Sequence, residues 1–257
     1  MRIVIKIGTS TLAYASGHLH IRRVEELCRV ISDIKNAGNE IILVSSGAIG
    51  MGVGKLGLPC RPKDIPTKQA AAAVGQCELM YTYDKLFGEY NHTVAQLLIT
   101  GADIENEARH RNFSNTITRL LELGVLPIIN ENDTLATEEI VIGDNDTLAA
   151  IVAKSVNAQL LVLLSDIDGL YTADPHKDPA AELIPLVTRL DEHILSLAGG
   201  NGSDLGTGGM VTKLNAAKIC LACGCDMVIA NGADPLHLYD ITDGKPVGTK
   251  FTGEYHA

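Results

Sequence analysis

The chain alternates short apolar runs with stretches of helical periodicity as far as about residue 230, and this alternation limits the fold more than any other feature. The apolar runs are typical of buried strands and lie at 2–7, 41–44, 93–99, 125–130, 160–165 and 226–230. The predicted helices lie at 20–36, 67–90, 113–123, 147–156 and 210–223. Such alternation produces right-handed crossovers and parallel strands. We therefore predict one α/β domain, in which helices cover both faces of a mainly parallel sheet.

The composition agrees with a globular enzyme. The 257 residues suffice for one large α/β domain with a buried core, or for two small ones. Hydrophobic residues make up 46% of the chain and charged residues 20%, which excludes wholesale disorder. Aromatic residues make up only 4% and tryptophan is absent, so aliphatic side chains must fill the core.

The charge balance argues against some partners. Lysine and arginine number 21 against 31 aspartates and glutamates, for a formal net charge of −10. This balance disfavours nucleic acid or an anionic membrane as the main partner. We find no apolar run near the roughly 20 residues of a membrane helix, and no secretory signal at 1–8. Six cysteines without a framework spacing predict reduced thiols in a cytoplasmic protein.

The segment Gly206–Lys213 combines three glycines with the start of the helix predicted at 210–223. A glycine turn that opens onto a helix N-terminus presents unpaired N–H groups to an anion. Lys213 lies in the first helical turn, where a cation opposes the helix dipole, and a bound phosphate would explain its presence. A plain connection with a helix cap explains the glycines but not the lysine. The segment lacks the Gly-Lys-Ser/Thr ending of a P-loop.

Two other strand ends carry candidate ligand groups. Lys6 precedes Gly8 where the first strand ends, which is the edge where parallel sheets bind ligands. A lysine that snorkels to the surface is an equal alternative. The turn Ser45–Gly47 could hold a carboxylate or a phosphate, or it could be a simple turn. The segment Gly52–Gly57 matches GxGxxG, but its glycines lie several residues past the strand, so we reject a dinucleotide site.

Acidic and amide side chains gather in the turns at 130–133 and 143–146. Helix capping accounts for one or two of them, so we interpret the rest as a functional cluster. The segment Cys220–Cys225 resembles half a zinc site but has no second ligand pair, and buried cysteines on a helix are the preferred interpretation. The basic run Arg109–Arg111 is better explained as a solvated helix face than as an anion site.

Together these motifs resemble the amino acid kinase family in order and spacing, from residue 1 to about residue 250. The resemblance rests on IVIKIGTS at 3–10, ILVSSGAIGMG at 42–52, KQAAAAVGQ at 68–76, INENDTLATEEIVIGDND at 129–146, LLSDIDGLYTADP at 163–175 and GTGGMVTK at 206–213. It implies a three-layer αβα sandwich of the carbamate kinase type, with an amino-acid-binding half at roughly 1–155 and a nucleotide-binding half at roughly 156–257. Many relatives carry a C-terminal PUA domain, which we expect to be absent here.

The resemblance also implies roles for individual residues. Lys6 and Lys213 would neutralise the transferring phosphoryl group, and Asp146 would orient both lysines. The amino acid would be held by Ser46, Asp133 and Asn145. The nucleotide would be held by Lys6, Ser165, Asp166, Thr207, Gly208, Gly209, Met210, Val211, Thr212 and Lys213. Three positions depart mildly from the family pattern, because Ser45, Ser165 and Val211 stand where threonine, threonine and serine are expected.

The implied reaction is phosphorylation of the side-chain carboxylate of L-glutamate by ATP, which gives L-glutamyl 5-phosphate and ADP in the first step of proline biosynthesis. A carboxylate is already ionised at neutral pH, so alignment and charge neutralisation suffice. Mg²⁺ would arrive with ATP, without dedicated protein ligands. Asp133 would accept from the α-ammonium group, and Ser46 and Asn145 would donate to the α-carboxylate. A homo-oligomer (dimer or tetramer) and inhibition by proline are further expectations.

Three alternatives remain to be weighed against this reaction. A kinase for N-acetylglutamate, aspartate, carbamate or a uridine nucleotide would share the fold, but a blocked amine gives Asp133 no ammonium group to pair with. A non-catalytic amino acid or nucleotide sensor would have no use for Lys6, Lys213 and Asp146 together. A dinucleotide-dependent oxidoreductase fails on the placement of its glycines.

Overall fold

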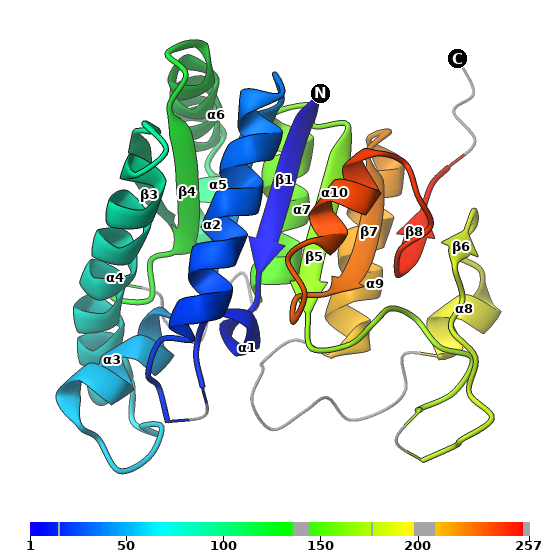
Figure 1. Cartoon of the computed structure of the whole chain (residues 1–257), viewed down its shortest axis with the longest axis horizontal. Coiled ribbons are helices and arrows are strands. Elements are labelled where there is room, and N and C mark those ends of the chain that lie inside the picture. The colour runs from blue at the N-terminus through cyan, green and yellow to red at the C-terminus, as the bar shows by residue number, and fades with distance from the viewer. Residues whose placement is uncertain (15, 136–143, 176, 198–208, 254–257) are drawn as a thin grey trace.

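The computed structural model describes residues 1–14, 16–135, 144–175, 177–197 and 209–253, which form an α/β sandwich around one sheet (Figure 1). The strands of this sheet are β1 (Arg2–Ile7), β2 (Glu40–Ser45), β3 (Val94–Ile99), β4 (Leu126–Glu131), β5 (Leu160–Ser165), β6 (Leu186–Val187), β7 (Asp226–Asn231) and β8 (Thr249–Phe251). Their order is β3-β4-β2-β1-β5-β7-β8-β6. All neighbouring strands are parallel except β7 and β8.

The central strand β1 pairs with β2 on one side and β5 on the other. The chain therefore builds one half of the sheet first and then returns to add the other half beside β1. Ligands of open α/β sheets bind outside the carboxyl ends of the strands at such a switch point. In Figure 1 these ends point towards the bottom of the view.

Helices cover both faces of the sheet (Figure 1). They are α1 (Thr9–Leu12), α2 (Ile21–Asn36), α3 (Ala48–Leu56), α4 (Ile65–Gly88), α5 (Gly101–Glu105), α6 (Glu107–Glu122), α7 (Asn145–Ser155), α8 (Glu192–Ser196), α9 (Met210–Ala222) and α10 (His237–Thr242). Side chains of α6, α7 and α9 pack on one face of the sheet, and side chains of α2, α4 and α10 pack on the other. The predicted three-layer αβα sandwich is confirmed.

The alternation of side chains along each strand explains the two cores. Val4 points into the core under α7 and α9, whereas its neighbours Ile3 and Ile5 point into the core under α2 and α4. All three are at most 1% exposed. Because both faces are buried, the strands are continuous apolar runs and not alternating ones.

Helices α3 and α4 pack backbone against backbone. A Cβ atom on Gly75 of α4 would lie 1.7 Å from the carbonyl oxygen of Ala48, and one on Gly52 of α3 would lie 1.8 Å from that of Ala71. Gly54 likewise lies against the backbone of Gly17. Of the glycines in the GxGxxG match, Gly52 serves helix packing, Gly54 serves packing against Gly17, and Gly57 ends α3 with a φ of 62°. These structural roles agree with our rejection of a dinucleotide site.

Some elements differ from the sequence prediction. Helix α6 begins at Glu107, where Asn106 caps it, six residues before the predicted start at Phe113. The prediction missed this start because the residues before Phe113 include no buried core residue. Cys220 and Cys225 are buried as expected, but Cys223 is exposed at the end of α9. The short strands β6 and β8 were not predicted. Among the described residues, none of the helices combines the length and the apolar character that a membrane crossing requires.

Candidate active site

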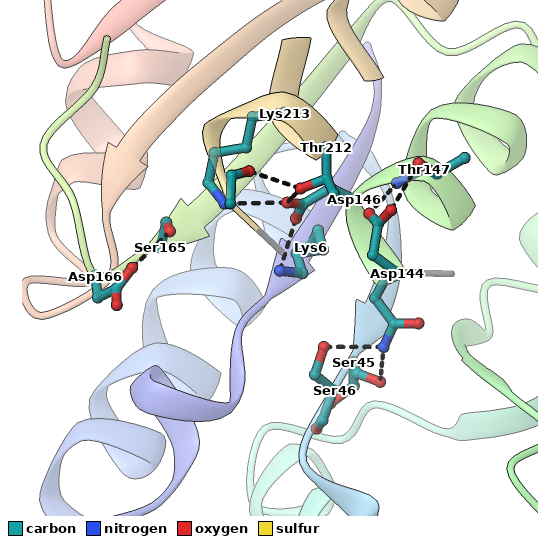
Figure 2. A network of polar contacts seen from close by, with 12 residues as sticks. Lys6, Ser45, Ser46, Asp144, Asp146, Thr147, Ser165, Asp166, Thr212 and Lys213 are labelled. Carbon is teal, nitrogen blue, oxygen red and sulfur yellow. Dashed lines mark hydrogen bonds and ion pairs between the residues drawn. The ribbon is translucent and has the colours of Figure 1, made fainter. Parts of the chain in front are cut away.

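Two lysines converge on one carboxylate at the carboxyl edge of the sheet (Figure 2). The Nζ atom of Lys6 lies 2.7 Å from Asp146 Oδ1, and the Nζ atom of Lys213 lies 3.0 Å from Asp146 Oδ2. Lys6 belongs to β1, whereas Asp146 and Lys213 lie in the first turns of α7 and α9, which pack side by side. We call Lys6, Asp146 and Lys213 the lysine–aspartate cluster. The structure thus unites three residues that the resemblance had assigned to phosphoryl transfer.

The lysine–aspartate cluster is buried and carries excess positive charge. Asp146 is 1% exposed, Lys213 3% and Lys6 9%. Burial opposes ionisation of Asp146, but the two lysine ammonium groups outweigh it and hold the pKa of this carboxyl below its usual value. With Asp146 ionised, two positive charges face one negative charge. A buried site with one surplus positive charge is suited to an anion such as a phosphoryl group.

Thr212 links this cluster to the start of α9. Its hydroxyl lies 3.0 Å from Asp146 Oδ2 and 2.8 Å from the carbonyl oxygen of Gly209, so it ties the first turn of α9 to the carboxylate. Gly209 caps α9 without a side-chain hydrogen bond, so within the described part of the chain no side chain caps the N–H groups of the first turn, and such groups can bind an anion. The family resemblance implied only nucleotide binding for Thr212, and nothing in the sequence indicated its contact with Asp146.

Next to the charges lies a network of neutral side chains. The Asn145 amide nitrogen lies 3.2 Å from the carbonyl oxygen of Ser45, 2.9 Å from Ser46 Oγ and 3.0 Å from Asn130 Oδ1. The Asn130 amide in turn donates to Gln76 Oε1 at 2.9 Å. We call Ser46, Asn145, Asn130 and Gln76 the amide network. The structure brings Ser46 and Asn145 into contact, and it joins to them Asn130 and Gln76, which the sequence prediction had not assigned.

The turn from β2 into α3 presents further donors to this network. Gly47 adopts a φ of 102°, a conformation that favours glycine, and it caps α3 without a side-chain hydrogen bond. No side chain of the described residues therefore caps the N–H groups of the first turn of α3 beside Ser46. Asp144, by contrast, accepts from Thr147 as the N-cap of α7, so this acidic residue has the capping role that the sequence allowed for some of the cluster.

Asp133 lies in the turn that follows β4, at the same edge of the sheet. Burial raises the pKa of its carboxyl, and the positive charge of Arg61 offsets only part of this effect. The charge of Arg61 therefore does not fully offset the cost of burying the ionised Asp133 carboxylate, and a positively charged ligand would offset the remainder. The prediction that Asp133 binds an ammonium group is not tested by this geometry and remains a prediction.

The other side of the cluster carries the residues assigned to the nucleotide (Figure 2). Ser165 ends β5, next to β1, and its hydroxyl donates to Asp166 Oδ1 at 3.1 Å. Met210 is partly buried and Val211 is exposed in the first turn of α9. Thr207 and Gly208 lie outside the described residues. Within the described ranges, His, Cys, Asp and Glu side chains form no group of three or more that could hold a metal ion.

A mainly parallel α/β sandwich whose switch point holds a buried cluster with one surplus positive charge is suited to the class of α/β phosphotransferases. Comparison with known proteins supports this class. The sequence model of the amino acid kinase family matches residues 1–231. The chain therefore belongs to the amino acid kinase family.

Similar proteins carry more specific names. The chain is 52% identical over 257 residues to glutamate 5-kinase from Clostridium perfringens (strain 13 / Type A), covering 98% of the chain and 96% of that relative. It is 54% identical over 249 residues to glutamate 5-kinase from Clostridium tetani (strain Massachusetts / E88), covering 97% and 93%. The names of these two relatives give glutamate as the compound that they phosphorylate.

Solved structures share the fold at low sequence identity. Carbamate kinase from Giardia lamblia bound to AMP-PNP gives a TM-score of 0.68 at 18% identity, covering 98% of both chains. The isopentenyl phosphate kinase product complex of T. acidophilum gives 0.66 at 18% identity, covering 98% of this chain and 100% of that one. These likenesses concern the fold alone, and they confirm the carbamate kinase type of sandwich.

Proposed function

We propose that this chain transfers the γ-phosphoryl group of ATP to the side-chain carboxylate of L-glutamate, giving L-glutamyl 5-phosphate and ADP. This product is the first intermediate of proline biosynthesis. The observation that carries the proposal is the junction of the lysine–aspartate cluster with the amide network at the successive residues Asn145 and Asp146. The names of the relatives that are about half identical over nearly the whole chain support the choice of glutamate.

The reaction requires charge neutralisation and alignment, and no general base. An oxygen of the ionised carboxylate forms the new bond to the γ-phosphorus, and the bond to the bridging oxygen breaks, leaving its electron pair on ADP. Lys6 and Lys213 stabilise the negative charge on the transferring group. Asp146 holds both ammonium groups in place and leaves one positive charge uncompensated for the phosphoryl group.

The substrate and the nucleotide occupy opposite sides of this cluster in our proposal. Ser46 and Asn145 line the amino acid site, where the Ser46 hydroxyl donates to the substrate and Asn145 holds Ser46 in place, and Asp133 accepts from the α-ammonium group. Ser165 and Asp166 hold the nucleotide together with Thr207–Lys213, in which the N–H groups at the start of α9 receive phosphate oxygens. The two roles correspond to an amino-acid-binding half at roughly residues 1–155 and a nucleotide-binding half at roughly 156–257.

Mg²⁺ accompanies ATP in this proposal and shields the charge of its phosphates. Because Asp146 is already engaged by two lysines, we assign no carboxylate of the chain as a dedicated Mg²⁺ ligand, and the ion keeps several waters. Further parts of the proposal are a cytoplasmic location, assembly into a dimer or tetramer, and inhibition by proline. These parts follow from the family resemblance.

The first test is ADP release from Mg-ATP with L-glutamate, N-acetyl-L-glutamate, L-aspartate, carbamate and UMP, each with and without EDTA. We expect turnover with L-glutamate alone, and loss of turnover when EDTA removes Mg²⁺. Turnover with another compound would keep the phosphotransfer chemistry and refute the substrate. Binding of ATP without turnover of any compound would favour a sensor on the same fold.

A further inference from the structure

The amide network has a fixed direction, because backbone groups anchor it at two points. The backbone N–H of Glu131 donates to Asn130 Oδ1 at 2.9 Å, so this atom is an acceptor and the other end of the Asn130 side chain is a donor. The carbonyl oxygen of Ser45 accepts from Asn145, which fixes the Asn145 amide nitrogen in the same way. The orientation of each amide therefore follows from the hydrogen bonds and not from an arbitrary choice of oxygen and nitrogen.

The same reasoning fixes the orientation of Gln76. Because the Asn130 amide nitrogen must donate, the atom of Gln76 at 2.9 Å from it is the acceptor Oε1. The Nε2 donor of Gln76 then points away from Asn130, and it is buried without a hydrogen-bond partner among the described residues. Gln76 is only 8% exposed. A buried donor without a partner destabilises the folded protein, so a ligand group that accepts a hydrogen bond from Nε2 would remove this unfavourable contribution.

The position of Gln76 indicates which ligand group it meets. Gln76 follows Gly75, which lies against the carbonyl oxygen of Ala48 in the first turn of α3, where N–H groups lack a side-chain cap. Through Asn130 and Asn145, the amide network joins the Gln76 side chain to Ser46, which precedes that turn. Ser46 and Asn145 line the same region. Gln76 Nε2, the Ser46 hydroxyl and the N–H groups at the start of α3 are neutral donors, whereas the Asn145 amide nitrogen already donates within the network. Together they suit a carboxylate and disfavour an ammonium group.

We propose that Gln76 is a substrate-binding residue whose Nε2 atom donates a hydrogen bond to the α-carboxylate of the amino acid. The inference rests on the proposed function and adds a residue that selects for a free α-carboxylate. The side-chain carboxylate must reach the lysine–aspartate cluster, whereas Gln76 is separated from Asp146 by Asn145 and Asn130 along the network. The α-carboxylate is therefore the group at the Gln76 end.

The test compares L-glutamate with L-isoglutamine, in which a carboxamide replaces the α-carboxylate. In Gln76→Glu, one carboxylate oxygen still accepts from Asn130, while the other now faces the substrate as an acceptor. We expect KM for L-glutamate to rise at least 30-fold, with kcat within threefold and KM for Mg-ATP within twofold. The preference for L-glutamate over L-isoglutamine, as a ratio of kcat/KM values, should fall by at least the same factor.

The control is Gln159→Glu, which adds the same charge at the opposite edge of the sheet, where Gln159 accepts from the backbone of Arg2. This variant should retain both substrate constants. If Gln76→Glu does not fold, Gln76→Met removes the donor without adding charge, and the preference should still fall about tenfold.

An unchanged preference in folded Gln76 variants would overturn the inference, even if both substrates lost activity, because that result would mean that Gln76 only supports Asn130. Failure of the unmodified enzyme to phosphorylate L-glutamate would instead refute the proposed function.

Discussion

The lysine–aspartate cluster and the amide network are adjacent, but they are built on opposite principles. The first consists of buried full charges with one surplus positive charge, and the second of neutral amides and a hydroxyl with unused donor capacity. Surplus charge stabilises a transferring phosphoryl group regardless of which acceptor receives it. Directed neutral donors distinguish one small carboxylate from another. The difference indicates that rate and substrate choice are controlled by separate neighbouring parts of the site.

The largest effect should come from breaking the cluster at Lys213. In Lys213→Met the surplus positive charge is lost, so kcat should fall by about 10³-fold while KM for L-glutamate changes little. Because Lys6 and Asp146 remain as a matched pair, the free energy of unfolding should change by less than about 1.5 kcal/mol. Steady-state kinetics and urea unfolding measure the two quantities.

Asp146→Asn is the matched comparison for that variant. It leaves two buried ammonium groups without a counter-charge and should reduce the free energy of unfolding by about 3 kcal/mol. The contribution of Asp146 to stability has a defined pH window. Its pKa is lowered in the folded protein, so this contribution is present above the ordinary value of 3.8 and is lost as the pH falls further. Equal stability losses in Lys213→Met and Asp146→Asn at pH 7 would contradict the surplus-charge description.

A smaller effect is expected at Asp133, the one acidic group assigned to the substrate side. Asp133→Asn should raise KM for L-glutamate about 100-fold, because the α-ammonium group loses its charged partner. The free enzyme should become slightly more stable at pH 7, since burial penalises the ionised carboxyl. Because the pKa of Asp133 is raised in the folded enzyme, the stability gained in Asp133→Asn should be present at pH values above this raised pKa. It should vanish as the pH falls towards the ordinary value of 3.8.

Thermal unfolding at pH 7 and near pH 4 measures this gain, with the exposed Asp84→Asn on α4 as the control. A variant that kept the KM of the unmodified enzyme would remove Asp133 from the substrate site.

The smallest effect separates two adjacent serines. Ser46 accepts from Asn145, but Asn145 keeps two other acceptors in Ser46→Ala, so KM for L-glutamate should rise only about fivefold. Ser45 instead pairs with the buried hydroxyl of Tyr83 at 2.9 Å. Ser45→Ala should therefore cost about 1–3 kcal/mol of stability and leave KM unchanged. The reverse pattern in kinetics and thermal unfolding would show that the roles of the two serines are exchanged.

The strands and the charged half of the site were predictable because their signals are local. The apolar runs identify the strands, and Lys213 stands out because a cation opposes the helix dipole at that position. Gln76 has no such signal, since a glutamine in an Ala-rich helix is ordinary and its partner Asn130 is 54 residues away. The Tyr83 contact with Ser45 and the Thr212 contact with Asp146 also span long separations. Such pairings depend on how the helices pack, which periodicity does not specify.

The first turn of α7 has a consequence for how such an enzyme can be altered. Asn145 and Asp146 are covalent neighbours, so a small rotation or shift of α7 displaces the substrate contact and the phosphoryl contact together. Changes in the core beneath α7 should therefore alter affinity and turnover in a correlated way. By contrast, changes on α4 should act mainly on affinity and changes on α9 mainly on turnover. A laboratory search for new acceptors would thus progress fastest on α3 and α4, with α7 left untouched.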